Sequence, residues 1–552
     1  MTAADLANII FPNIKETRED IEKKYPKRNL KEGAKVTRFA PSPTGFVHLG
    51  GLYQALICDN LAKHSDGVFM LRNEDTDTKR EVKGASKLIM ETLEHYNLTP
   101  DEYEDEEGNI KGAYGPYKQS ERKYIYQVFI KYLIEIGRAY PCFCSHEKLD
   151  EIRKKQEKYK QRTGYYGIYS TCRKLSVDDA YNKIKQGEPY IIRFKSKGSP
   201  DEKFRFDDLV KGRIMMPQND LDVVIMKQDG LPTYHFAHVI DDYLMGTTHA
   251  SRGEEWLSSV PIHLELFNAL GIKPPKYIHT PNIMKKENGK YRKISKRKDP
   301  EASMTYYSEH GYPALAVIES LMTIINTNYE EWHMHAPDKT YKDFEYSPKK
   351  MSASGGLYDL DKLANISKTV ISKMTKEELY QESYNWASKY DQKLKEIINR
   401  DKDYYMNIIN IEREQKKPRK DIAKYEDIIN NIWYMYDDLF DQNTSEYEWQ
   451  KITDKEEIRQ IITKYMESYF DITSKDEWFN GIKKLTEDLG YCANMKEYKQ
   501  NPSQYKGNVA DISTVLRVAL TKKSMTPDLY EIMRLIGKDR IVGRFNRIWC
   551  KI

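Results

Sequence analysis

The stretch that decides the fold runs from Arg38 to Arg80 and reads RFAPSPTGFVHLGGLYQALICDNLAKHSDGVFMLRNEDTDTKR. Lys35 to Ala40, which overlaps its start, fits a short strand. Pro41 to Gly45 (PSPTG) forms a turn, because proline fixes φ and glycine permits positive φ. Apolar residues at helical spacing follow Gly50-Gly51, and a second strand-like run covers Val68 to Leu71. We therefore predict a βαβ unit whose ligand site lies at the carboxyl ends of the strands, beside the helix N-terminus.

The composition indicates a polar protein of several domains. The chain has 552 residues, too many for one ordinary core, so we expect three or four domains. A net charge of +5 neither requires nor excludes a nucleic-acid partner. Six cysteines in a chain of this length do not indicate a disulfide framework. We find no apolar run long enough to span a membrane and no secretory signal, and we therefore expect a reduced, cytoplasmic enzyme.

Two later segments also carry candidate chemistry. The first runs from Leu231 to Trp256 and contains PTYHFAH, VIDD and RGEEW; its histidines, taken alone, are typical of satisfied structural histidines rather than metal ligands. The second, Lys285 to Lys298, holds eight basic residues and one acid in fourteen positions. Such a run is typical of a solvated loop or a nucleic-acid patch. Lys293 and Lys296 stand three positions apart within this run.

Together these segments resemble the glutamyl branch of the class I aminoacyl-tRNA synthetases. The resemblance rests on Arg38, the PSPTG turn, His48-Leu49-Gly50-Gly51, the RNEDTD run that starts at Arg72, RGEEW, and Lys293-Ile294-Ser295-Lys296-Arg297, which is similar to the second class I signature. Gly51 departs from the class signature His-x-Gly-His, although this branch often has glycine there. The resemblance is specific over about 35–325 and looser over 326–552, and we find none for 1–34.

The resemblance implies an α/β fold in which a class I Rossmann-like catalytic domain carries an inserted α+β domain and is followed by all-helical domains. We expect the following division: a catalytic domain at 35–114 and 223–325, an inserted tRNA acceptor-binding domain at 115–222, a stem-contact region at 326–384, and a helical anticodon-binding domain at 385–552. Residues 1–34 would be a helical extension that is either docked on the catalytic domain or free as a partner-binding arm.

Two local patterns refine this picture. Leu221 to Met226 is apolar and β-branched, which predicts a buried strand that returns to the catalytic sheet. Near the chain's end, Thr526-Pro527-Asp528 is an N-cap signal, the stripe of Leu529, Ile532, Met533 and Ile536 predicts a helix, and Gly537 is a plausible C-cap.

The activity that the resemblance implies is glutamate–tRNA ligation. L-Glutamate would be activated by ATP to glutamyl-adenylate and transferred to the 3′-terminal adenosine of tRNA(Glu); charging of tRNA(Gln) stays an open alternative. The catalytic residues implied are His48, Gly50, Lys293 and Lys296. ATP, with Mg²⁺, would face these residues together with Gly51 and Glu255. Glutamate would be bound by Arg38, Ala40, Ser42, Glu74, Tyr234, His238 and Arg252, since a guanidinium offers carboxylates a planar bidentate fork.

Three rival interpretations stay open at this point. A glutaminyl enzyme would have other polar residues near Glu74 and β-barrels at its C-terminus. The short paralogue that glutamylates a modified tRNA base would lack an anticodon-binding end. A catalytically silent, synthetase-like RNA-binding protein would not need the two lysines of the KISKR motif. We expect the chain to be a monomer that has no membrane partner.

Cys142, Cys144 and Cys172 form a candidate metal site. Some bacterial members of the resembled family hold zinc here with a Cys-x-Cys pair and a later cysteine. Tetrahedral zinc takes four ligands, so His146 or Tyr169 would have to supply the fourth. The alternative is three reduced cysteines packed in a small core.

Overall fold

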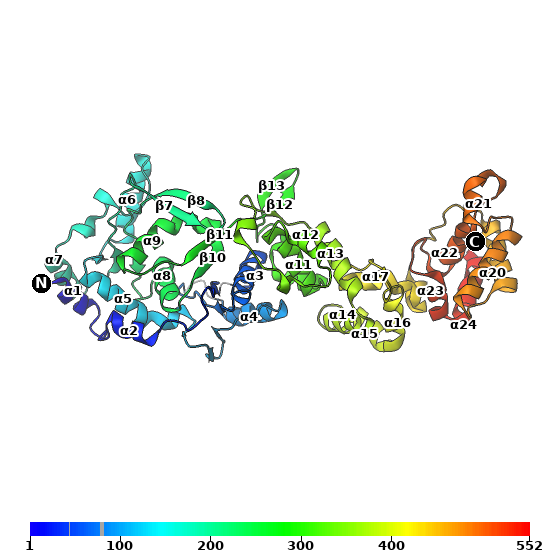
Figure 1. Ribbon diagram of the computed structural model, residues 1–552, viewed down its shortest axis with the longest axis horizontal. Coiled ribbons are helices and arrows are strands. Elements are labelled where there is room, and N and C mark those ends of the chain that lie inside the picture. Colours follow the sequence, from blue (N-terminus) through cyan, green and yellow to red (C-terminus); the bar gives the residue numbers. More distant parts are fainter. Residues whose placement is uncertain (44, 78–81, 552) are drawn as a thin grey trace. The chain divides into compact units, whose positions relative to one another are not determined.

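The computed structural model describes residues 1–43, 45–77 and 82–551, with side chains to 548 (Figure 1). Thr44 of the PSPTG turn and Arg80 at the end of the quoted stretch therefore lie outside the described residues. The contacts divide the chain into two compact units, Met1–Tyr306 with Ile318–Asp359, and Tyr307–Val317 with Leu360–Ile552. The first unit thus continues past 325, where the sequence places the end of the catalytic domain. Over the described residues, no helix is long and apolar enough to cross a membrane.

The predicted βαβ unit is present. Strand β1 (Val36–Phe39) pairs in parallel with β2 (Val68–Leu71), and α3 (Leu49–Lys63) connects them. A second parallel pair, β10 (His249–Gly253) with β11 (Lys276–Thr280), lies beside β1. All of β1 and most of α3 are buried, as expected for a strand covered on both faces. The carboxyl ends of these strands meet at one edge, where parallel sheets bind their ligands.

The segment between β2 and β10 forms helices and three small antiparallel sheets, of which the smallest pairs β3 (Tyr103–Glu104) with β4 (Ile110–Lys111). In chain order its longer elements are α4 (Ala85–His95), α5 (Lys123–Glu135), β5 (Ala139–Cys142), α6 (His146–Lys158), α7 (Val177–Lys185), β6 (Ile191–Phe194), β7 (Lys203–Asp208), β8 (Gly212–Pro217), β9 (Val224–Met226) and α8 (Tyr234–Leu244). One sheet has the order β5-β6-β9, and β7 pairs with β8. The prediction that Leu221–Met226 returns to the catalytic sheet is wrong. Strand β9 pairs with β6 because Ile225 and Met226 pack into the core that α5 and α8 share.

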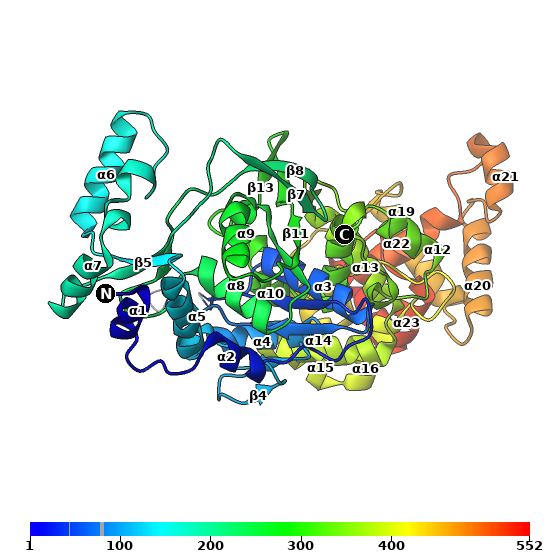
Figure 2. The same cartoon turned by 60° about the vertical axis from the view of Figure 1, so that its left-hand side comes forward.

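The N-terminal extension is docked rather than free. Helices α1 (Ala3–Ile10) and α2 (Arg18–Lys24) share one apolar core with α5, and α1 also contacts α7 (Figures 1 and 2). The docking surface spans both predicted domains: α5 and α7 belong to the predicted insertion, whereas Arg18 donates to the Leu270 carbonyl and Glu22 accepts from the Tyr243 hydroxyl, both in the predicted catalytic domain. Arg28 adds a polar anchor, because its guanidinium pairs with Glu102 at 2.7 Å and lies 3.8 Å from the centre of the Tyr114 ring.

The last part of the first unit follows α9 (Val260–Ala269). Strands β12 (Ile283–Glu287) and β13 (Lys290–Lys293) form a hairpin, and β14 (Gly356–Leu357) pairs with β12 on its other edge. This pairing explains why Ile318–Asp359 belongs with the first unit. Helices α10 (Met304–His310), α11 (Ala314–Ile325) and α12 (Tyr329–His335) lie between these strands in the sequence.

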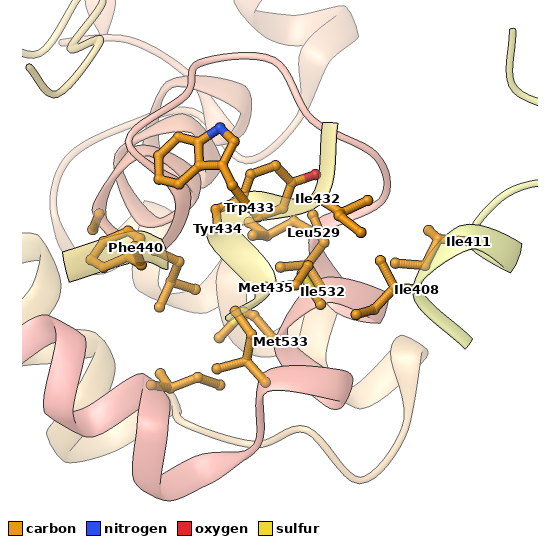
Figure 3. Packing of buried hydrophobic residues seen from close by; sticks show 14 of the residues in the cluster. Ile408, Ile411, Ile432, Trp433, Tyr434, Met435, Phe440, Leu529, Ile532 and Met533 are labelled. Carbon is orange, nitrogen blue, oxygen red and sulfur yellow. The ribbon is translucent and has the colours of Figure 1, made fainter. Parts of the chain in front are cut away.

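The described residues of the second unit form no strand. Its helices are α13 (Leu360–Lys373), α14 (Lys376–Tyr390), α15 (Gln392–Arg400), α16 (Lys402–Asn410), α17 (Ile428–Ile432), α18 (Asp437–Gln442), α19 (Lys455–Lys464), α20 (Lys475–Asp488), α21 (Met495–Gln500), α22 (Val509–Thr521), α23 (Leu529–Ile536) and α24 (Lys538–Lys551). The predicted stripe of α23 is buried, and Figure 3 shows Leu529, Ile532 and Met533 packed near Ile432 and Met435. The glutaminyl alternative predicts β-barrels at the C-terminus, so this helical end argues against it.

Candidate active site

A cavity of about 700 Å³ opens at the carboxyl ends of β1, β2 and β10. Apart from His238, every residue predicted to contact ATP or glutamate lines it: Arg38, Ala40, Ser42, His48, Gly50, Gly51, Glu74, Tyr234, Arg252, Glu255, Lys293 and Lys296. These residues come from segments far apart in the sequence, and folding brings them to one place. Their roles toward each substrate stay predictions.

His48 caps α3 at the edge of this cavity. Its Nδ1 accepts a hydrogen bond from the Gly51 N–H at 3.1 Å, so the ring's proton is on Nε2. Burial, together with the charges of Lys296 and Lys293, lowers the pKa of His48 to about 4, and the ring is therefore neutral at pH 7. A Cβ at Gly50 would lie 3.2 Å from His48 Nδ1, so glycine gives the ring its room. A neutral imidazole with an Nε2–H donor beside a helix N-terminus is suited to phosphate oxygens.

The KISKR loop is fastened at its base by an ion pair. Arg292 donates from both of its terminal nitrogens to Asp299, each at 2.7 Å, and Asp299 also accepts the Ser295 N–H at 2.8 Å. Arg292 holds the pKa of Asp299 well below its usual range, against the effect of burial. Lys293 and Lys296 stay exposed at the cavity, and neither has an ion-pair partner within the described parts of the chain. The Arg292–Asp299 pair therefore joins the two ends of the loop, and both ammonium groups face the cavity.

A buried ionic network supports the floor of the cavity. Arg72, which is fully buried, pairs with Asp242 at 2.7 Å and with Glu74 at 3.0 Å. Arg38 Nε also contacts Asp242, at 3.1 Å. Burial opposes ionisation of Asp242, but Arg38 and Arg72 outweigh it and hold its pKa well below the usual range. Glu74 lines the cavity, and there burial raises its pKa against the pull of Arg72.

Arg252 has a different environment from Arg38 and Arg72. Its Nε donates to His279 Nε2 at 2.9 Å, and its Nη1 donates to His263 Nδ1 at 3.0 Å. Its guanidinium lies 4.5 Å from the centre of the Tyr277 ring. Among the residues described, no carboxylate pairs with Arg252, and its buried Nη2 has no hydrogen-bond partner. The cavity thus offers a buried cation that lacks a counter-charge.

The structure places His238 behind the cavity wall. Its ring is fully buried and stacks on Tyr234, with ring centres 5.8 Å apart, and its Nε2 lies 3.0 Å from the Tyr277 hydroxyl. Tyr234 also lies against Trp256, at 4.2 Å between ring centres. His238 therefore packs against the back of Tyr234. Its side chain does not line the cavity, so the geometry argues against the predicted contact with glutamate.

The predicted cysteine cluster assembles in the insertion. The sulfur atoms of Cys142, Cys144 and Cys172 all lie within 4.8 Å of one another. The expected fourth ligands do not join them: His146 is exposed at the start of α6, and the Tyr169 hydroxyl donates to Gln161. Instead the hydroxyl of Tyr165 lies 3.3 Å from Cys144 Sγ and 3.6 Å from Cys142 Sγ.

Sequence reasoning assigned no role to several residues that build these sites. They are Asp242, His263, His279, Asp299 and Tyr165. Asp242 stands in the quoted VIDD motif and Asp299 directly follows the basic run, so their positions offered a signal. Nothing in the local pattern distinguishes His263, His279 or Tyr165.

Comparisons with known proteins agree with this geometry. The family model described as tRNA synthetases class I (E and Q), catalytic domain, matches residues 35–365, and the one described as anticodon binding domain matches 378–549. A glutamate–tRNA ligase from Clostridium perfringens (strain SM101 / Type A) is 48% identical over 548 residues, which cover 99% of each chain. A glutamate–tRNA ligase from Clostridium beijerinckii is 46% identical and also covers 99% of each.

A solved structure is similar over nearly the whole chain. It is a glutamate tRNA ligase from Elizabethkingia meningosepticum in complex with its amino acid. The TM-score is 0.74 at 27% identity, and the match covers 93% of this chain and 99% of that one.

Proposed function

The chain belongs to the glutamate–tRNA ligase family of class I tRNA synthetases, and we propose that it activates L-glutamate with ATP and transfers the glutamyl group to the 3′-terminal adenosine of tRNA(Glu). The predicted fold class, a class I catalytic domain with a helical anticodon-binding end, is confirmed by the same matches. Charging of tRNA(Gln), the monomeric state and the cytoplasmic location stay predictions.

The observation that carries the choice of amino acid is the unpaired guanidinium of Arg252. Glutamate and glutamine are nearly isosteric, so shape alone separates them poorly. A buried cation without a counter-charge gains a charge-assisted hydrogen bond from a carboxylate, whereas a glutamine amide leaves it desolvated and unneutralised. Because Arg252 is only 6% exposed, the difference in binding free energy between a carboxylate and an amide at this guanidinium is large.

The first chemical step needs positioning and charge stabilisation rather than an enzyme nucleophile. The α-carboxylate of glutamate attacks the α-phosphate of ATP, and pyrophosphate leaves. His48, through its Nε2–H, and the ammonium groups of Lys293 and Lys296 would contact the phosphates as negative charge moves onto the leaving group. Glu74, on the same cavity wall, would accept the amino group of glutamate.

The second step consumes the adenylate. A terminal ribose hydroxyl of tRNA attacks the activated carbonyl, and AMP leaves. Aminoacyl-tRNA synthetases use ATP together with Mg²⁺, which would neutralise part of the charge of the triphosphate. The helical second unit, which matches an anticodon-binding family, would supply tRNA selection.

A structural zinc ion fits the cysteine cluster. The three sulfur atoms lie within 4.8 Å of one another, and the Tyr165 hydroxyl lies within 3.6 Å of two of them, so the cluster offers the four donors that tetrahedral zinc requires. The Tyr165 hydroxyl also accepts the Cys172 N–H at 3.0 Å, which keeps it at the sulfur atoms. We assign these four residues to zinc, and the ion would cross-link the small core of the insertion without entering the chemistry.

The test of the proposed function is a charging assay. Purified protein, ATP and Mg²⁺ are incubated with tRNA(Glu) or tRNA(Gln) and with labelled glutamate or glutamine. We expect glutamate to be attached to tRNA(Glu). An Arg252→Gln variant should show a raised KM for glutamate and an unchanged KM for ATP. Arg205→Gln, which alters an exposed arginine on β7, is the matched control and should behave as wild type. Failure of the wild-type protein to charge tRNA(Glu) would refute the assignment.

A further inference from the structure

We propose that His263 and His279 are positioning residues that hold Arg252 through uncharged acceptor nitrogens and so reserve its positive charge for the carboxylate of glutamate. This inference rests on the proposed function and concerns the specificity of the same site. Both imidazoles are fully buried, as is most of Arg252.

The hydrogen-bond geometry fixes the protonation of both rings. A guanidinium has donors only, so His279 Nε2 and His263 Nδ1 must each present a lone pair to Arg252. The proton of His279 is then on Nδ1, which donates to Asp208 at 2.7 Å. The proton of His263 is on Nε2, which donates to His235 Nδ1 at 3.0 Å.

A charged form of either ring would break the contact with Arg252. Doubly protonated imidazole has no lone pair and would face the guanidinium donor to donor. Burial, assisted by the charge of Arg252, lowers the pKa of both His263 and His279, so the neutral tautomers are the stable ones. Asp208 orients His279 but does not touch Arg252 itself.

The other arginines of the cavity floor show the contrast. Arg38 and Arg72 both pair with Asp242, so their charges are largely neutralised by the protein. Arg252 is held by two hydrogen bonds and by the Tyr277 ring, but none of these partners carries a negative charge. A carboxylate in place of either imidazole would hold the guanidinium equally well and would also quench it. Neutral acceptors are therefore the feature that keeps this site selective for an anionic substrate.

Three substitutions at one position separate the possibilities. His263→Asn keeps an acceptor oxygen near the place of Nδ1, His263→Leu removes the acceptor, and His263→Glu puts a carboxylate against Arg252. The charging assay is run with each variant to obtain KM for glutamate, KM for ATP, kcat and the preference for glutamate over glutamine. Thermal unfolding is followed for all variants. His249→Asn is the matched control, because His249 is on the same strand as Arg252 but bonds to Thr248.

We expect the glutamate KM to rise about 10- to 100-fold in His263→Leu and His263→Glu, since hydrogen bonds to charged groups are worth factors of this size. The KM for ATP should stay within about twofold of wild type, and His263→Asn should restore most of the glutamate affinity. His263→Glu should also lose the preference for glutamate over glutamine. His279→Gln, which keeps an acceptor near the place of Nε2, should resemble His263→Asn.

Three results would overturn the proposal. One is a wild-type glutamate KM in His263→Glu. Another is an Asn variant that is as impaired as the Leu variant. The third is an equal rise of both KM values in every variant, which would mark a general structural role. If the Leu variant does not fold, the comparison between Asn and Glu still decides the question. Charging by the wild-type protein tests the proposed function separately, so failure of the two can be told apart.

Discussion

Substitution of Asp299 by asparagine is expected to release the KISKR loop. Asn is nearly isosteric with Asp but is uncharged, so it removes the counter-charge of Arg292 and weakens the cap on the Ser295 N–H. The loop is the segment that carries Lys293 and Lys296 at the cavity. Its loss of order should therefore slow adenylate formation while glutamate still binds.

The size of the effect follows from the contacts. Hydrogen bonds to a buried charged group are worth about 1.5–3 kcal/mol each, and Asp299 accepts two from Arg292 at 2.7 Å. Glu287 limits the loss, because it also pairs with Arg292 at 2.7 Å and keeps that side chain near the hairpin. We therefore expect the ordered form of the loop to lose about 2–3 kcal/mol of stabilising free energy, which corresponds to a fall in kcat of roughly 30- to 150-fold.

The assay is ATP–pyrophosphate exchange with glutamate and tRNA present, from which kcat and both KM values are obtained. Because Arg292 keeps the Asp299 carboxylate ionised until the pH falls well below its usual pKa, the deficit of Asp299→Asn should be constant between about pH 6 and pH 9. Asp207→Asn is the matched control: Asp207 also pairs with arginines, but on the exposed β7–β8 hairpin. A wild-type kcat in Asp299→Asn, or an equal loss in Asp207→Asn, would refute the reasoning.

Three further predictions concern other parts of the chain. Lys296→Ala should slow adenylate formation about 10²- to 10³-fold, as expected for loss of an oxyanion-type contact, whereas Lys298→Ala should not; equal rates in the two variants would contradict this role. Purified protein should contain about one zinc ion per chain by metal analysis, and Cys172→Ser and Tyr165→Phe should each lower zinc retention in a chelator titration; full retention in Tyr165→Phe would remove Tyr165 from the site. Burial raises the pKa of Asp59 to about 6, so its charged form costs stability as the pH rises from about 4 to above 6. Asp59→Asn should therefore raise the free energy of unfolding by about 1–3 kcal/mol at pH 8 and by little at pH 4, as measured by denaturant unfolding, and a gain of equal size at both pH values would contradict the assignment.

The sequence alone determined the elements whose signals are local. Helix α23 is an example: Asp528 caps it by accepting the Glu531 N–H at 3.1 Å, its apolar stripe is buried, and Gly537 ends it with φ of 82°. The βαβ unit was equally readable, because a turn and two periodicities within about 40 residues specify it. Most of the residues predicted to line the cavity came from the resemblance to the family. They could be found in the sequence because each family motif is a short, continuous run.

Only the tertiary structure decided which distant side chains meet. Tyr165 reaches the cysteine sulfurs, Asp208 reaches His279, and Asp242 joins Arg38 and Arg72, each across long sequence separations. The pairing partner of β9 was likewise misplaced by sequence reasoning. The physical reason is that periodicity and capping record how a segment folds on itself. Which buried donor then finds which acceptor depends on the packing of whole elements, and that information is spread over the entire chain.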